Sequence, residues 1–280
     1  MPELPEVETV CRGLRGFLEH HKLCEVVVRR RDLRVPIPAD FEQRLLGRTV
    51  LRLERRAKYI LWFLDSDEVL LAHLGMSGRL FGYRHDDPKR PTAAGKHDHV
   101  WLRTEDDTLI CYSDPRRFGL LTLAPAQKLA DHPLLKELGI EPLEPALSPS
   151  TLREALRNRR VPIKVALLDQ SVVVGIGNIY ASEILHRAHI SPQRVAAELT
   201  PLEHKALCKA IPEILRKAID AGGSTLRDYV QANGELGGFQ NLFAVYEREG
   251  QPCPERGCPG TIHRIVQAAR ATYFCPRCQH

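Results

Sequence analysis

The chain has 280 residues, a length that allows roughly two or three domains with a sizeable core. Lys and Arg number 40 against 35 acidic residues, and the net charge of +5 is compatible with a nucleic-acid partner without demonstrating one. The sequence shows neither an apolar run near the roughly 20 residues of a membrane span nor a signal peptide, so we expect a cytoplasmic protein without a membrane partner.

The chain starts with the motif Met-Pro-Glu-Leu-Pro-Glu-Val-Glu. Loss of Met1 would leave Pro2 as a free secondary amine, and an α-amino group with a pKa of about 8 is partly unprotonated near neutral pH. Such an amine attacks an aldehyde to give a cationic iminium, which is an electron sink, and the Glu3 carboxyl follows directly. The alternative is an ordinary N-terminus in which Pro5 starts a helix.

Apolar residues at helical spacing predict a first helix over 5–19. Apolar and alternating runs then predict strands over 23–28, 50–53, 59–64, 69–74, 100–103, 108–112 and 119–123. Short strands separated by turn residues are typical of an antiparallel sandwich or barrel. A short helix is expected over 133–138, and the closely spaced prolines that follow predict a linker over 141–149.

Beyond the linker the pattern is helical. The predicted helices cover 150–158, 162–169, 179–188 and 201–221. Thr200, Pro201 and Glu203 give the last helix a capping box with proline in its first turn. Residues 231–241 are rich in glycine and amides and are expected to form a mobile loop.

Four cysteines near the C-terminus have the spacing of a metal site: Cys253, Cys258, Cys275 and Cys278. Two close pairs separated by a hairpin-length segment suit one tetrahedral zinc ion, which would supply much of the folding free energy of so small a unit. The alternative, two disulfides, is disfavoured in a cytosolic chain.

A glycine-containing turn, Val-Gly-Ile-Gly-Asn, lies between two predicted helices. Its backbone N–H groups and the start of the next helix would suit an anion, with Asn178 as a further donor. Lys164 and a series of arginines over 153–160 lie nearby in sequence, which favours a phosphate clamp. Taken alone, the segment reads as an ordinary interhelical turn.

Met76 and Phe118 lie near predicted turns, where they are either core residues or wedges that enter a base stack. Lys58 and His97 are either phosphate contacts or solvated charges. His97 and His99 also suggest a second metal site, but no further ligand spacing supports it.

Several motifs then resemble formamidopyrimidine-DNA glycosylase. They are Met-Pro-Glu-Leu-Pro-Glu-Val-Glu-Thr, Arg-Arg-Ala-Lys-Tyr, His-Leu-Gly-Met-Ser-Gly, Lys-His-Asp-His, Asp-Pro-Arg-Arg-Phe-Gly, Gly-Ile-Gly-Asn-Ile-Tyr-Ala-Ser-Glu and the terminal four-Cys finger. They fall in family order over nearly the whole chain.

The resemblance implies an α+β multidomain fold. We expect an N-terminal β-sandwich catalytic domain with flanking helices over 1–140, and the linker over 141–149. A helical helix-two-turn-helix DNA-binding domain with a lesion-capping loop is expected over 150–241. It is followed by a zinc finger over 242–280 with one structural zinc.

The resemblance also implies a monomer that acts on damaged double-stranded DNA. It would flip out and excise 8-oxoguanine and formamidopyrimidines, then cleave the strand by β,δ-elimination. Pro2 would be the Schiff-base nucleophile and Glu3 the proton donor, while Lys58 would assist β-elimination and Arg270 δ-elimination. The residues implied to fill the gap left by the flipped nucleotide are Met76, Arg116 and Phe118. The residues implied to hold phosphates are His97, Arg116, Arg160, Lys164 and Asn178.

The chain departs from the family pattern at the finger and at the capping loop. The first Cys pair is spaced x4 where the family usually has x2, and the loop reads Gly-Glu-Leu-Gly-Gly-Phe where the family often has Lys-Pro-Gly-Tyr-Phe. Arg159 could also substitute for Arg160 after a shift of one residue. The weighed alternatives are an endonuclease VIII-like enzyme for oxidised pyrimidines and a non-catalytic zinc-dependent DNA-binding protein.

Overall fold

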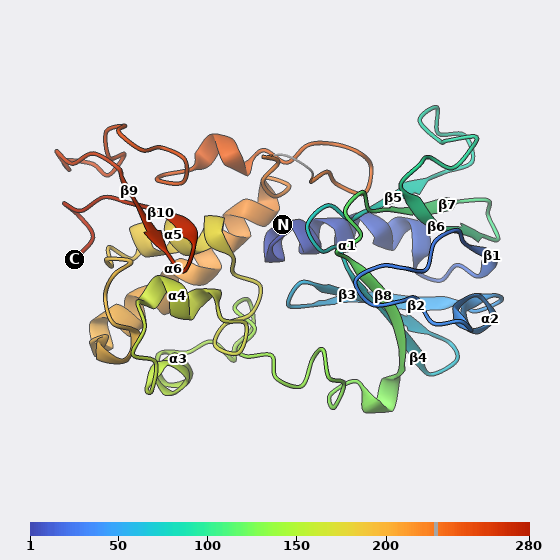
Figure 1. The fold of residues 1–280 in the computed structure, drawn as a ribbon, viewed down its shortest axis with the longest axis horizontal. Coiled ribbons are helices and arrows are strands. Elements are labelled where there is room, and N and C mark those ends of the chain that lie inside the picture. The colour runs from blue at the N-terminus through green and yellow to red at the C-terminus, as the bar shows by residue number, and fades with distance from the viewer. Residues whose placement is uncertain (227–228) are drawn as a thin grey trace. The chain divides into compact units, whose positions relative to one another are not determined.

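The computed structural model describes residues 1–226 and 229–280, which divide into two compact units. The sheet unit comprises Met1–Lys136 and Ala221–Gly238, and the helical unit comprises Glu137–Asp220 and Phe239–His280. Figure 1 shows strands dominating the first unit, and helices with a terminal hairpin making up the second. The sheet unit is therefore assembled from segments that lie far apart in the sequence.

Within the described residues, the sheet unit contains two four-stranded antiparallel sheets. One has the order β1-β6-β7-β5, with bounds Leu23–Val28, Asp98–Thr104, Leu109–Ser113 and Arg79–Tyr83. The other has the order β2-β3-β4-β8, with bounds Val50–Arg56, Tyr59–Leu64, Glu68–His73 and Leu120–Pro125. The predicted N-terminal β-sandwich is confirmed.

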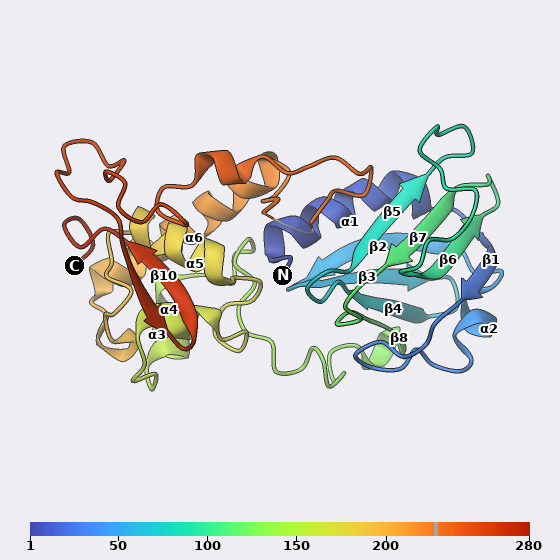
Figure 2. The same ribbon diagram turned by 45° about the horizontal axis from the view of Figure 1, so that its top comes forward.

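Helix α1 (Leu4–Leu18) packs against strands of both sheets, β2 and β3 of one and β5 of the other. Figure 2 shows it running beside these strands. Its buried face follows the helical period and contributes Val7, Val10, Cys11, Leu14 and Leu18 to the core. The short helix α2 (Phe41–Leu45) and the 3₁₀ turn η1 (Ala126–Lys128) complete the helical elements described in residues 1–136.

The helical unit packs α5 (Asn178–Arg187) against α4 (Ile163–Leu168) and α6 (Pro201–Asp220), and α3 (Pro149–Leu156) against α6. One 3₁₀ turn, η2 (Ala196–Glu198), lies between α5 and α6, and another, η3 (Phe239–Leu242), follows α6. The predicted capping box of α6 is confirmed: the Glu203 N–H donates to the Thr200 hydroxyl at 3.2 Å, and the Thr200 N–H donates to the Glu203 carboxylate at 2.6 Å.

The chain ends in an antiparallel hairpin of β9 (His263–Gln267) and β10 (Arg270–Phe274). Its turn consists of Ala268 and Ala269, both in the left-handed region with φ of 45° and 60°. Such a turn favours Asn and Gly, so two alanines hold the hairpin tip at a cost. None of the described helices combines the length and apolar character needed to cross a membrane.

Strand β5, the short helix α2 and the segment 133–138 differ from the prediction. Strand β5 was not predicted because Gly82 interrupts its pattern, yet a Cβ at that position would lie 2.5 Å from the Phe17 ring, so glycine is what lets the helix pack there. The helix predicted over 133–138 is wrong, because this segment forms turns in which Leu135 and Lys136 donate to the His132 carbonyl. The N–H groups of the next residues, Gly139 and Ile140, donate to the carbonyls of Gln170 and Val172, so no helix continues here.

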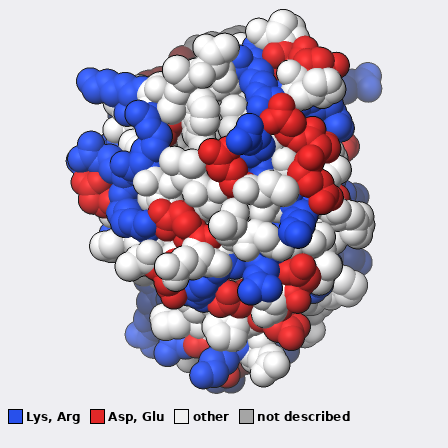
Figure 3. All heavy atoms as spheres, turned by 90° about the vertical axis from the view of Figure 1, so that its right-hand side faces the viewer, with Lys and Arg blue, Asp and Glu red and all other residues white. Residues whose placement is uncertain are grey.

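The end of the sheet unit formed by β1 and α2 carries charges of both signs. Figure 3 faces this end and shows Lys and Arg interspersed with Asp and Glu. Arg103 pairs with Glu25 at 2.5 Å, and Arg90 pairs with Asp107 at 3.0 Å. Mixed charges of this kind cancel at a distance, so this face is a poor candidate for binding a polyanion.

Candidate active site

The first residues of the chain are buried at the start of α1. Pro2 and Glu3 are buried, whereas Met1 is 56% exposed. The Glu6 carboxylate accepts hydrogen bonds from the Glu3 N–H at 2.8 Å and from the Ser224 N–H at 2.8 Å. One buried carboxylate therefore ties the chain start to a segment 218 residues later.

That later segment closes on itself inside the sheet unit. The Gly238 N–H donates to the Ala221 carbonyl at 2.8 Å, and the Gly237 N–H donates to the Thr225 hydroxyl at 2.8 Å. A Cβ at Gly237 would lie 2.3 Å from the Gly223 carbonyl oxygen, whereas one at Gly238 would meet its nearest atom at 3.4 Å. Gly237 is therefore required by close backbone packing, while Gly238 has room for a side chain.

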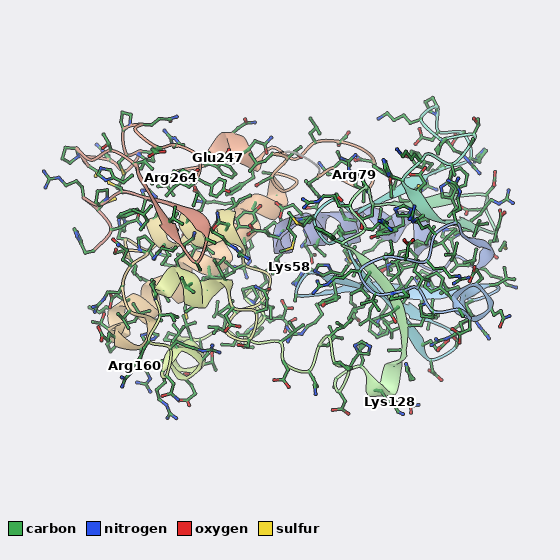
Figure 4. The ribbon with its side chains drawn as sticks, in the orientation of Figure 1. Lys58, Arg79, Lys128, Arg160, Glu247 and Arg264 are labelled. Atoms are coloured by element: carbon green, nitrogen blue, oxygen red, sulfur yellow. The ribbon has the colours of Figure 1, made fainter. Side chains whose placement is uncertain are left out.

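The β2–β3 turn carries Lys58 to the same end of the sheet unit. Figures 1 and 2 both draw the N-terminus near this turn, and Figure 4 labels Lys58 there. Arg55 pairs with Glu8 of α1 at 2.8 Å and donates to the Ala57 carbonyl at 3.1 Å. Ala57 has a φ of 53°, a conformation that costs a non-glycine residue about 1 kcal/mol. The ion pair thus fixes a strained turn against the helix that begins the chain.

The charge of the Glu8 carboxylate also stabilises this turn. Burial would raise its carboxyl pKa, but the Arg12 hydrogen bond and the nearby Arg55 charge hold the pKa below its usual value. Glu8 is therefore ionised at neutral pH and keeps its ion pair with Arg55 of the turn. Lys58 itself has only 6% of its surface exposed, so this residue is largely enclosed at the turn.

Sequence reasoning did not single out His73, which ends β4. The Gly75 N–H donates to its Nδ1 at 3.0 Å. Burial, followed by the charges of Lys58 and Arg34, lowers the pKa of His73 to about 4, so the ring is neutral near pH 7. With Nδ1 accepting, the ring proton lies on Nε2, where it can be donated to an anionic oxygen. The feature of the sequence that could have identified His73 is a polar residue at the end of a strand of apolar residues.

Two loops present the predicted wedge residues. Met76 is 38% exposed and Phe118 is 44% exposed, so both apolar side chains are accessible to a ligand. The Arg116 guanidinium lies 4.8 Å from the centre of the Phe118 ring. A Cβ at Gly75 would lie 2.4 Å from the Phe118 carbonyl carbon, so the two loops are in backbone contact.

Asp114 holds these two loops together. It is fully buried and accepts hydrogen bonds from the Ser77 hydroxyl at 2.7 Å, the Tyr112 hydroxyl at 3.1 Å and the Gly119 N–H at 2.8 Å. The Ser77 oxygen in turn accepts the Arg116 N–H at 3.1 Å. The two loops that carry the exposed Met76 and Phe118 side chains are therefore joined by buried hydrogen bonds through Asp114.

The histidines of the Lys-His-Asp-His motif have different environments. His97 is half-buried, and its carbonyl accepts the Asp114 N–H at 2.9 Å. His99 is buried, with Nε2 2.8 Å from the Asp114 carbonyl. Neither belongs to a cluster of potential metal ligands within the described residues, which is consistent with the absence of supporting spacing.

In the helical unit, Lys164 is fully buried rather than presented at the surface. Its Nζ donates to Asn178 Oδ1 at 2.7 Å, to the Ala271 carbonyl at 2.9 Å and to the Thr272 hydroxyl at 2.7 Å. Asn178 Nδ2 also donates to the Ala271 carbonyl at 3.0 Å. Lys164 thus joins the start of α5 to the hairpin strand that begins with Arg270.

The remaining predicted basic residues lie nearer the surface. Arg270 is exposed at the hairpin tip, and Arg160 is exposed at the periphery of the helical unit, as Figure 4 shows. Arg159 instead pairs with Asp169 at 2.7 Å and donates to the Ser171 hydroxyl at 2.9 Å. This engagement favours Arg160 over Arg159 as a contact for an external anion.

The four C-terminal cysteines converge in space. Their sulfurs all lie within 4.8 Å of one another, and none forms a disulfide. Cys253 and Cys278 are 3.7 Å apart, and Cys258 and Cys275 are 3.6 Å apart. Tetrahedral zinc–thiolate bonds place sulfurs about 3.8 Å apart, so the x4 spacing still allows the four residues to hold one structural zinc.

Comparison with known families matches the chain in three segments. Residues 1–121 match the formamidopyrimidine-DNA glycosylase N-terminal domain, residues 138–230 the H2TH domain of the same enzyme, and residues 250–280 the zinc finger found in FPG and IleRS. The matches follow the order of the motifs described above.

Individual relatives agree over the full length. The formamidopyrimidine-DNA glycosylase of Paracoccus denitrificans is 51% identical, with all of both chains covered. The crystal structure of the MutM (Fpg) protein from Thermus thermophilus superposes with a TM-score of 0.85 at 40% identity, covering 99% of this chain and 98% of that one. The complex of Lactococcus lactis Fpg with DNA containing an abasic site gives 0.87 at 34% identity, covering 99% of each chain.

The Asp114 network predicts a local loss of order when its charge is removed. Asp114→Asn should cost about 1–3 kcal/mol of unfolding free energy, because hydrogen bonds to a buried charged group are stronger than neutral ones. Tyr112→Phe, which removes one neutral donor, should cost about 1 kcal/mol. Hydrogen exchange at Gly119 should accelerate far more in Asp114→Asn than in Tyr112→Phe. Equal protection of Gly119 in both variants would show that Asp114 does not hold the loops.

Proposed function

The chain belongs to the formamidopyrimidine-DNA glycosylase family, and from that premise we propose how its own residues carry out the two reactions of such an enzyme. It is a DNA glycosylase of base excision repair with AP lyase activity, and it carries one structural zinc in a four-Cys finger. Its substrates are oxidised purines, 8-oxoguanine and formamidopyrimidines among them.

We assign the nucleophile to Pro2 after loss of Met1. The secondary amine attacks C1′ of the damaged nucleoside as the bond to the base breaks. The attached nitrogen then loses its proton, and the C1′–O4′ bond opens with protonation of O4′, which gives the iminium that is the electron sink for elimination. Glu3 is the proton donor that assists base departure. The observation that carries this assignment is the buried start of α1, where the Glu6 carboxylate fixes the Glu3 backbone at 2.8 Å.

Two basic residues serve the elimination steps. Lys58, enclosed at the β2–β3 turn and held through Glu8 and Arg55, assists β-elimination. Arg270, exposed at the hairpin tip, assists δ-elimination. The Lys164 bond to the Ala271 carbonyl supports the second role, since it fixes the backbone next to Arg270.

Phosphate binding is shared among donors of both units. His97, Arg116, Arg160 and Asn178 contact phosphate oxygens, and Lys164 contributes through Asn178, which it holds at 2.7 Å. The Nε2–H of His73 is a further donor beside Lys58, although sequence reasoning did not include it. Met76 and Phe118, as exposed apolar wedges, fill the gap left by the extruded nucleotide together with the Arg116 side chain.

We further propose damaged double-stranded DNA as the partner of a monomeric enzyme that acts at the bacterial nucleoid in the cytoplasm, without a membrane partner. For the domains we propose a catalytic domain over 1–140, the linker over 141–149, a DNA-binding domain over 150–241 and the finger over 242–280. Residues 221–238, expected within the DNA-binding domain, group with the sheet unit.

Glu3→Gln should separate the two reactions. An amide is a poor proton donor, so excision of a damaged base should fall by about 10²-fold or more. Cleavage of a preformed abasic site needs only the amine and a base, and should fall much less. Single-turnover rates on lesion and abasic duplexes measure both effects. An equal loss of both reactions would mean that Glu3 is merely structural.

Gly238 should govern base selection. It offers no side chain to pack on a flipped base, so we expect efficient excision of formamidopyrimidines with weaker discrimination against oxidised pyrimidines than the family pattern suggests. Gly238→Tyr has room for its Cβ and should sharpen preference for 8-oxoguanine. Leu236→Tyr, at a 66% exposed position of the same loop, is the matched control. An unchanged lesion profile in Gly238→Tyr would exclude this residue as the selector.

A further inference from the structure

Helix α5 contacts one of the four C-terminal cysteines, Cys253. The Nε2 atom of His186 lies 3.5 Å from Cys253 Sγ, and the imidazole is buried with 4% exposure. A zinc-bound cysteine is a thiolate and has no proton to donate. The direction of this hydrogen bond is therefore fixed, with the His186 N–H as donor and the sulfur as acceptor.

The other sulfur of the first pair also has a donor outside the metal shell. The Gly260 N–H lies 3.4 Å from Cys258 Sγ. A Cβ at Gly260 would lie 2.6 Å from Cys275 Sγ, so glycine is required for this approach. Both cysteines of the lengthened x4 pair are thus held by hydrogen bonds to sulfur, one from the backbone and one from a side chain of another element.

The same face of α5 holds the chain where it enters the finger. Glu183, one helical turn before His186, accepts the N–H groups of Ala244, Val245 and Tyr246 at 2.8, 3.0 and 2.8 Å. Val245 packs with Cys253 and Cys275 in a small buried cluster. Helix α5 therefore fixes both the approach to the finger and its first ligand.

We propose that His186 is a positioning residue of the zinc site, which donates its Nε2–H to the Cys253 thiolate and slows loss of the metal. Partners outside the metal shell orient the ligands, and their removal typically weakens metal binding about 10–100-fold. The longer first loop leaves its cysteines more conformational freedom, and the bond to α5 restrains the first of them.

The test compares His186→Phe, which keeps a ring but removes the donor, with His186→Gln, which keeps an N–H donor. His85→Phe is the control, because that ring is 69% exposed and belongs to the sheet unit, which contains none of the four C-terminal cysteines. The readouts are the rate of zinc release from the full-length protein to a chelator and the sulfur-to-cobalt charge-transfer band of the cobalt-substituted protein. We expect about 10-fold faster release and a shifted band in His186→Phe, with the other variants close to wild type.

Equal release rates and identical bands in wild type and His186→Phe would overturn the proposal. So would a Gln variant that behaves like the Phe variant, because ring packing rather than the N–H would then be responsible. The wild-type protein loaded with an NMR-active cadmium isotope gives a test without substitution. Coupling between the His186 Nε2 proton and the metal is expected, and an assigned proton without coupling would contradict the hydrogen bond.

Discussion

The sheet unit depends on how the start of α1 is held. A nucleophile at the chain start is useful only if its backbone is fixed, and terminal residues usually fray. Here the Glu6 carboxylate accepts N–H groups from Glu3 and Ser224, so the first residues are pinned from within the helix and from residue 224. The Glu8–Arg55 pair then fixes the Lys58 turn against the same helix. Glu6 and Glu8 of one helix thus fix the two segments that carry the proposed nucleophile Pro2 and the proposed elimination residue Lys58.

The helical unit is organised in a similar way around α5. Asn178 begins this helix and is held by Lys164, which also binds the hairpin strand next to Arg270. Glu183 and His186 lie further along and hold the entry to the finger and its first cysteine. Burying an ammonium without partners would be costly, so the three acceptors around Lys164 are what make its position tolerable. A short helix therefore links the proposed phosphate site to the metal.

Patterns with a strong local cause were predictable from the sequence. The helical period of α1, the capping box of α6 and the convergence of four cysteines all follow from residues close together in the chain. Strand β5 was missed because Gly82 serves packing against Phe17, a contact that sequence does not display. The burial of Lys164 was missed because its partners at 271–272 are more than 100 residues away. Whether a polar side chain is buried or available to a ligand depends on such contacts between distant residues, which the sequence does not display.

In the proposed mechanism, Pro2 carries the covalent chemistry. Borohydride reduction of the enzyme on an abasic-site duplex, followed by peptide mass spectrometry, locates the residue attached to the sugar. We expect an N-terminal peptide that begins at Pro2, lacks Met1 and carries the adduct on the proline nitrogen. An adduct on Lys58 or another lysine, or full trapping by protein shown to retain Met1, would contradict it.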